Sequence, residues 1–196
     1  MSHEVLITLI LSMAIALAGK QYDLKKISKV KIKGLALFPA SFFLQYLSMF
    51  IVERYGATTA GLLVLEHFKW IHLLSYQLLL IGVVLNIKKR YMKILFIGTM
   101  LNFIVILFNG MQMPVRIPPE YAKAWENHIY LISGKDLVHT VMTEDTRFSY
   151  LGDIIMLKKP YPFNKTISIG DIFLLLGYGK FMLEESKITI KSPGAR

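Results

Sequence analysis

The stretch from Phe68 to Ile87, FKWIHLLSYQLLLIGVVLNI, is followed directly by Lys88-Lys89-Arg90 and decides the fold class of this chain. About 20 mostly apolar residues in a helix span a hydrocarbon core of about 30 Å. Lysine and arginine next to such a run mark its cytoplasmic end. The stretch therefore predicts a membrane-spanning helix that ends in the cytoplasm.

The composition of the whole chain agrees with that prediction. Of 196 residues, 54% are hydrophobic and 18% are charged, which is more apolar material than one soluble domain of this length buries. Cysteine is absent, so disulfides, thiolate metal sites and a cysteine nucleophile are excluded. The formal charge of +10 falls in short segments between apolar runs, where it indicates topology and not nucleic-acid binding.

Apolar runs predict a helix at each of five positions: residues 5–18, 35–52, 68–87, 94–108 and 168–184. Together they indicate an all-α integral membrane protein, with one membrane domain over residues 1–196 and a long loop over residues 110–167. The patch Gly61 to Leu65 is either a loop or the start of the third helix. Residues 1–4 lack the basic region of a cleavable signal, so we expect the first helix to be retained.

The distribution of positive charge orients this bundle. Lysine is frequent between the first and second helices, between the third and fourth, and after the fifth. The connection between the second and third helices is mixed, with Arg54 beside Glu53 and Glu66. The lysine-rich segments share one side only if the chain crosses the membrane five times. We therefore expect the N-terminus and the loop 110–167 outside, and the C-terminus in the cytoplasm.

The loop 110–167 is predicted to form a small folded cover. Pro118-Pro119-Glu120 indicates a helix start, and the amphipathic face that follows carries Tyr121, Trp125, His128, Ile129 and Ile132. Ser133 to Asp136 has capping-box spacing and predicts a second short helix over residues 137–142. The two prolines in residues 158–163 favour an extended segment along the lipid headgroups.

Small and polar residues form stripes on several of the predicted helices. They are Thr8, Ser12, Ala16 and Gly19 on the first, Ser41, Gln45 and Ser48 on the second, and Thr99, Asn102 and Asn109 on the fourth. Such stripes let helices approach closely and form hydrogen bonds between them. A polar pathway or a ligand cavity is the alternative interpretation.

The outer end of the third helix is a candidate binding site, since it carries Glu66, His67, Lys69 and His72. Ionisable residues at membrane depth are costly and usually face a partner, water or a ligand. In the simpler interpretation, Lys69 reaches the interface and pairs with a carboxylate such as Glu66. The alternative is an anion-binding or proton-handling site, to which Asn109, Asp153 and Asp171 could contribute from the outer side.

The loop holds the other chemical groups, His128, His139, Glu144, Asp145, Arg147, Asp153 and Asp171. No ligand pair stands at helical i, i+4 spacing, so neither a metal nor another cofactor is expected. No nucleophile or nucleotide motif is present, so catalysis has no support. The repeated element LGDII at 151–155 and IGDIF at 169–173 is typical of turns in which aspartate caps a helix.

Several short motifs together resemble a family of small bacterial membrane proteins of unknown function. They are Asn109-Gly110 with Met113-Pro114-Val115, then Thr146-Arg147-Phe148, Leu151-Gly152-Asp153, Pro160-Tyr161-Pro162 and Ser168-Ile169-Gly170-Asp171. The resemblance covers essentially the whole chain and implies a multi-pass protein of the bacterial plasma membrane. Family members often carry a second glycine after the Asn-Gly pair, where this chain has Met111.

We therefore expect a non-enzymatic membrane subunit whose outer loop contacts membrane lipids, a partner membrane protein or a second copy of the chain. A second hypothesis is a membrane enzyme or carrier for a lipid-linked or anionic substrate at the outer face. It requires the polar end of the third helix to converge with Asp153 or Asp171 in one outward pocket. A third is an oligomeric channel.

Overall fold

The computed structural model describes residues 10, 23–117, 131–133, 135–157 and 165–187. Within them the chain is mainly helical, with α2 (Leu37–Tyr55), α3 (Thr59–Val84), α4 (Arg90–Phe108) and α6 (Ile169–Ser186). The short elements are η1 (Leu24–Lys29), β1 (Met113–Val115), β2 (His139–Val141), η3 (Ser149–Leu151), β3 (Ile155–Leu157) and β4 (Lys165–Ile167). The predicted helix at 5–18, apart from residue 10, lies outside these residues, as do the predicted helix start at 118–120 and the proline segment 158–163.

Helices occupy the four later positions expected from the apolar runs, but α3 begins earlier than expected. The patch Gly61 to Leu65 belongs to α3, because Thr58 accepts a hydrogen bond from Gly61 N–H at 3.2 Å and caps the helix. Glu66 and His67 do not interrupt it. By length and composition, α3 and α4 are the two helices in the described part of the chain that could cross a membrane.

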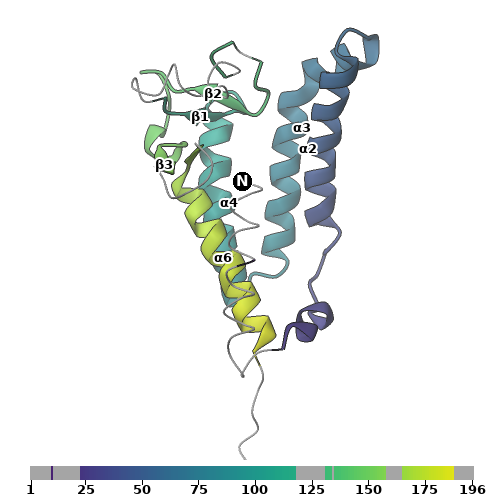
Figure 1. Cartoon of the computed structure of the whole chain (residues 1–196), viewed down its shortest axis with the longest axis vertical. Coiled ribbons are helices and arrows are strands. Elements are labelled where there is room, and N and C mark those ends of the chain that lie inside the picture. The colour runs from purple at the N-terminus through teal and green to yellow at the C-terminus, as the bar shows by residue number, and fades with distance from the viewer. Residues whose placement is uncertain (1–9, 11–22, 118–130, 134, 158–164, 188–196) are drawn as a thin grey trace, which may run out of the picture.

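The helices are arranged as two pairs, α2 with α3 and α4 with α6 (Figure 1). The α3–α4 turn, η1 and the end of α6 lie at one end of the molecule, and the strands lie over α4 at the other (Figure 1). Buried Val83, Tyr91, Met92, Leu95 and Leu174 form an apolar core towards the first end. A second core, of Val105, Ile106, Met113 and Leu151, lies beneath the strands.

The α4 and α6 helices approach closely because glycines face each other at their contact. A Cβ atom on Gly98 would lie 2.6 Å from the carbonyl oxygen of Gly170, and one on Gly170 would collide with the side-chain amide of Asn102. Gly177 leaves room for the side chain of Leu95 in the same way. Small residues let helix backbones meet at short range, so this pair packs closely along much of its length.

The cover at the strand end contains strands where a helix was expected, so the fold is mainly helical and not all-α. The prediction of a short helix over residues 137–142 is wrong: His139–Val141 form β2, which pairs in parallel with β1. The Asp136 side chain accepts from Val138 N–H and His139 N–H, both at 2.8 Å, which makes a turn and not a helix start. The β-branched residues that follow favour the strand. A second small sheet joins β3 to β4 in antiparallel register.

Candidate functional site

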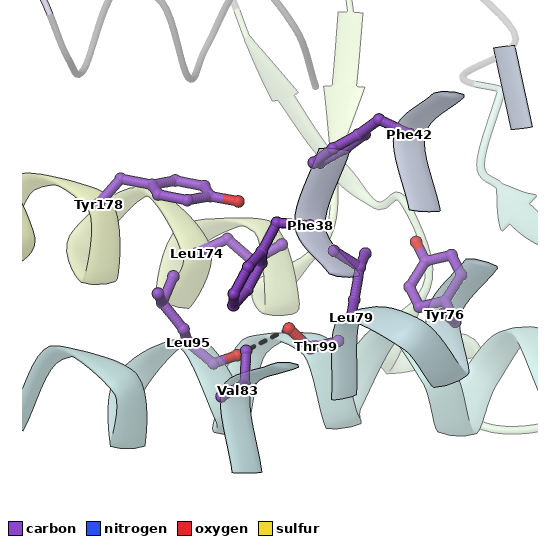
Figure 2. A pocket seen from close by; sticks show the side chains of 9 residues that line it. All are labelled: Phe38, Phe42, Tyr76, Leu79, Val83, Leu95, Thr99, Leu174 and Tyr178. Atoms are coloured by element: carbon purple, nitrogen blue, oxygen red, sulfur yellow. Dashed lines mark hydrogen bonds between the residues drawn. The ribbon is translucent and has the colours of Figure 1, made fainter. Parts of the chain in front are cut away.

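Side chains from α2, α3, α4 and α6 line a small cavity between the two helix pairs. Figure 2 shows its lining: Phe38 and Phe42 from α2, Tyr76, Leu79 and Val83 from α3, Leu95 and Thr99 from α4, and Leu174 and Tyr178 from α6. Its volume is about 30 Å³, which is room for a water molecule or two. Thr99 donates its hydroxyl hydrogen to the Leu95 carbonyl at 2.8 Å (Figure 2). The cavity is therefore an apolar gap in the packing and not a ready-made substrate pocket.

A closed polar junction joins α4 to the start of α6. Asn102 donates to Asp171 Oδ1 at 2.9 Å and accepts from the Ser168 hydroxyl at 2.9 Å. Asp171 N–H in turn donates to Ser168 Oγ at 2.9 Å, and Ser168 N–H donates to Asp171 Oδ2 at 3.2 Å. This is a capping box, so the capping prediction for Asp171 is confirmed. Asp171 thus holds the helix start against α4.

Hydroxyl groups in the predicted polar stripes behave differently from Asn102. Ser41 and Ser48 on α2 donate to carbonyls of their own helix, of Phe38 and Leu44, and Thr99 does the same on α4. These three hydroxyls therefore use helix backbone as their partner. Of the stripe residues on α2 and α4, Asn102 supplies the cross-link between helices that the stripes were expected to provide.

His72 is the buried member of the predicted cluster on α3. Its side chain is fully buried, and its Nδ1 lies 2.9 Å from the Met111 carbonyl oxygen. Because a carbonyl only accepts, Nδ1 carries the hydrogen and Nε2 keeps a lone pair. That Nε2 atom is buried without a hydrogen-bond partner in the described part of the chain. The contact ties α3 to the turn after α4.

The other charged residues of that cluster do not gather around His72. Glu66, His67 and Lys69 are exposed, and His67 Nδ1 makes its hydrogen bond with the Leu63 carbonyl of its own helix at 2.9 Å. Lys69 extends towards the turn after α4, where a Cβ atom on Gly110 would lie 3.9 Å from its Nζ. The predicted outer cluster is thus divided between a buried histidine and exposed charges.

The turn after α4 has two residues in a backbone conformation that favours glycine. Gly110 has φ of 69° and Met111 has φ of 62°, in the left-handed region that L side chains rarely adopt. The resemblance places a second glycine at the position of Met111. In this chain a methionine holds the same conformation, and its side chain packs against the core beneath the strands.

Two amide side chains attach the cover to this turn. Asn109 donates to the Arg147 carbonyl at 2.8 Å and accepts from Arg147 N–H at 2.9 Å. Gln112 donates to the carbonyls of Asp136 and His139 at 3.1 and 3.2 Å. Asn109 was singled out from the sequence but Gln112 was not. Gln112 lies between two methionines at the end of an apolar run. A polar residue in that position indicates a structural role.

Asp136 accepts hydrogen bonds from both backbone and side chain in the cover. Burial raises its pKa, but hydrogen bonds from the His139 side chain and from two backbone N–H groups outweigh burial, so the pKa is lowered overall. His139 Nδ1 lies 3.1 Å from Asp136 Oδ2. Among the described residues, no three His, Cys, Asp or Glu side chains stand close enough to hold a metal ion.

Asp153 is buried beside β1, and the residues that follow it form strand β3 and not a helix. Its N–H donates to the Pro114 carbonyl and its carbonyl accepts from Arg116 N–H, both at 2.9 Å. The capping prediction is therefore wrong for Asp153, since the chain around it runs extended and pairs with Val115. The LGDII and IGDIF elements share a sequence pattern but differ in structure.

Sequence reasoning missed the polar contacts at the opposite end of the bundle. Glu185 Oε1 accepts from the Tyr91 hydroxyl at 2.6 Å and from Lys89 Nζ at 2.7 Å. Asn86 is buried and bonds the backbone of Lys33 in both directions, at 2.8 and 2.9 Å. Asn86 stands at the end of an apolar run, where an amide usually has a structural partner.

Comparison with known proteins relates the chain to a protein family but to no known activity. A family model described as a family of unknown function, DUF5317, matches residues 29–183. An uncharacterized protein of Thermotoga maritima is 29% identical over 159 residues, which cover 79% of this chain and 77% of that protein. No solved structure matches the chain. Because the family model covers most of the sequence, the chain belongs to the DUF5317 family.

Proposed function

We propose that this chain is a five-span protein of the bacterial plasma membrane, N-terminus outside, that works as a non-enzymatic binding subunit. The observation that carries the membrane assignment is the exposed face of α2. Phe43 and Tyr46 are 65% and 71% exposed, and Phe42, Met49 and Phe50 are exposed beside them. Contiguous apolar surface of this kind is costly in water and marks a lipid or protein contact.

Exposed apolar side chains continue around α3, which supports lipid as the surrounding medium. Leu62, Leu63, Trp70, Leu74 and Ile81 are all exposed. Together with the α2 face they run along the full length of this helix pair. A hydrocarbon environment removes the cost of that exposure, whereas one protein partner would have to cover both helices.

The binding role is supported by the apolar surface of the cover. Ile132 and Tyr150 are each 59% exposed, and Phe148 stacks edge-on against exposed Phe108 with ring centroids 5.2 Å apart. Aromatic side chains exposed on a fixed scaffold are typical of protein contacts. We assign this surface to a partner membrane protein or a second copy of the chain, with lipid headgroups beside it.

The enzyme or carrier hypothesis receives less support from the described residues. It required the α3 charges, Asp153 and Asp171 to converge, but Asp171 is engaged by Asn102 and Ser168, and Glu66 and His67 are exposed. No observation favours a channel over the binding role.

Topology can be tested with single-cysteine variants, because the natural chain has no cysteine. Lys88→Cys and Lys135→Cys place exposed thiols at opposite ends of the molecule. In intact cells an impermeant maleimide should label Lys135→Cys, and Lys88→Cys only after the membrane is opened. Labelling of both thiols in intact cells, or release of the chain from membranes by alkaline carbonate, would overturn the proposal.

The cover's role can be tested with photo-crosslinking residues at Tyr150 and, as a matched control, at exposed Glu144. Crosslinking in native membranes should give a discrete adduct from position 150 and little from position 144. Equal or absent adducts at the two positions would contradict a partner surface at the exposed aromatics.

A further inference from the structure

A set of basic side chains surrounds one end of the helix bundle. They come from η1, from the segment between η1 and α2, from the α3–α4 turn and from the first turn of α4, which lie together in Figure 1. We call this set the basic end: Lys29, Lys31, Lys33, Lys88, Arg90 and Lys93, all of them exposed.

The structure holds these segments together although they are far apart in the sequence. Asn86 Nδ2 donates to the Lys33 carbonyl at 2.8 Å, and Lys33 N–H donates to Asn86 Oδ1 at 2.9 Å. Asp23 N–H donates to the Ser186 carbonyl at 2.7 Å and attaches η1 to the end of α6. The cations are therefore gathered by the fold and not merely by composition.

Nearby acids leave these cations uncompensated. Glu185 pairs with Lys89 at 2.7 Å, and Glu184 pairs with Lys180 at 3.0 Å. The six side chains of the basic end form no ion pair within the described part of the chain. Exposed like charges held close together repel one another, so an anionic ligand there would lower the free energy of the folded protein.

Exposed apolar side chains lie directly beside the basic end. Leu35, Val84 and Leu85 are about half exposed, and Leu85 packs next to Gly34 in the lysine-bearing segment. A ligand that fits both surfaces has an anionic head and a hydrocarbon chain. A polynucleotide would satisfy the charge but would leave the apolar side chains in water.

We infer that the basic end binds the headgroups of anionic phospholipids, whose acyl chains lie against exposed Leu35, Val84 and Leu85. The inference rests on the proposed membrane function and names the lipid class in the leaflet that meets this end. Each basic side chain at a membrane surface raises the affinity for anionic lipid roughly fivefold.

The test uses the full chain in nanodiscs made from equal amounts of phosphatidylcholine and phosphatidylglycerol. The protein is extracted in mild detergent, and the lipids that remain bound are counted by mass spectrometry. The basic-end variant combines Lys29→Gln, Lys31→Gln, Lys88→Gln and Arg90→Gln. The control variant removes as many exposed cations at the other end, by Lys69→Gln, Arg116→Gln, Lys135→Gln and Arg147→Gln.

The natural chain and the control should retain phosphatidylglycerol in excess over phosphatidylcholine, and raised salt should reduce that excess. In the basic-end variant, the excess of phosphatidylglycerol should be at least about fivefold lower than in the natural chain. Its thermal unfolding midpoint in neutral detergent should stay the same. No enrichment in the natural chain, or equal loss in both variants, would overturn the inference alone. Failure of the natural chain to enter nanodiscs would instead overturn the proposed membrane function.

Discussion

The two helix pairs are built on different principles. The α4–α6 pair interlocks through Gly98, Gly170 and Gly177 and is cross-linked by Asn102. The α2–α3 pair uses its serines within each helix, as Ser48 and Ser75 do, and leaves large apolar side chains exposed. The α4–α6 contact is thus defined by specific packing, whereas the exposed surface of α2–α3 depends on the medium around it.

The largest expected effect comes from filling the glycine contact. Gly170→Ala would drive a methyl group into the Asn102 amide, so the free energy of unfolding should fall by about 3 kcal/mol. Titration with sodium dodecyl sulfate in mixed micelles measures it. Gly82→Ala on α3 would bring a methyl group to 3.0 Å from the Phe38 ring, a side chain that can shift, and it gains about 1 kcal/mol of helix propensity, so its net cost should be clearly smaller. Equal responses would mean that the glycine contact is not close-packed.

Removing the cross-link should come next. Asn102→Ala takes away the partners of Asp171 and Ser168 inside the helix contact, so we expect a loss of about 2 kcal/mol. Ser48→Ala on α2 removes a hydroxyl bonded to its own helix and should change stability by less than about 0.5 kcal/mol. A similar cost for both variants would erase the contrast between the pairs.

A smaller effect is expected at the turn after α4. Met111→Ala loses core packing and keeps the unfavourable φ of 62°, whereas Met111→Gly loses the same packing but relieves the backbone. The glycine variant should therefore be more stable than the alanine variant by about 1 kcal/mol. The alanine variant being the more stable would show that the left-handed backbone carries no strain.

The smallest effect is a pH dependence of the cover. Because the pKa of Asp136 is lowered in the folded state, its carboxylate stabilises the fold above the usual aspartate pKa of about 3.9. That contribution should be lost as pH falls through the lowered folded value. Protection from hydrogen exchange at Val138 and His139, whose N–H groups donate to Asp136, should fall in that pH range by more than the intrinsic pH dependence of amide exchange explains. An Asp136→Asn variant that keeps the same acid response would contradict this.

The sequence predicts the helical part of the fold better than the cover. Apolar runs locate α2, α4 and α6 closely because helix periodicity and length are local properties. The sequence leaves the start of α3 open between a loop and a helix because Glu66 and His67 interrupt the apolar run, while the Thr58 cap lies upstream. The capping-box pattern at Ser133 misled because β2 forms only through pairing with β1, a long-range contact that local spacing does not encode.

Some polar residues singled out from the sequence make structural contacts, but the sequence did not predict their partners. Asn102, His72 and Asn109 all make contacts that join separate elements. Their partners are backbone carbonyls or a helix cap, and backbone carries no sequence signature. The basic end was interpreted as a topology signal, whereas its assembly around Asn86 could be seen only in three dimensions.

The most direct test of the membrane assignment is to measure which medium, lipid or water, surrounds the exposed face of α2. A nitroxide at Phe43→Cys, on the cysteine-free chain reconstituted in lipid, reports collisions with apolar oxygen and with a water-soluble nickel chelate. We predict frequent oxygen collisions and almost no nickel collisions, with the reverse at Lys88→Cys. Free access of the nickel chelate to position 43 would mean that water covers this face, and the membrane assignment would be contradicted.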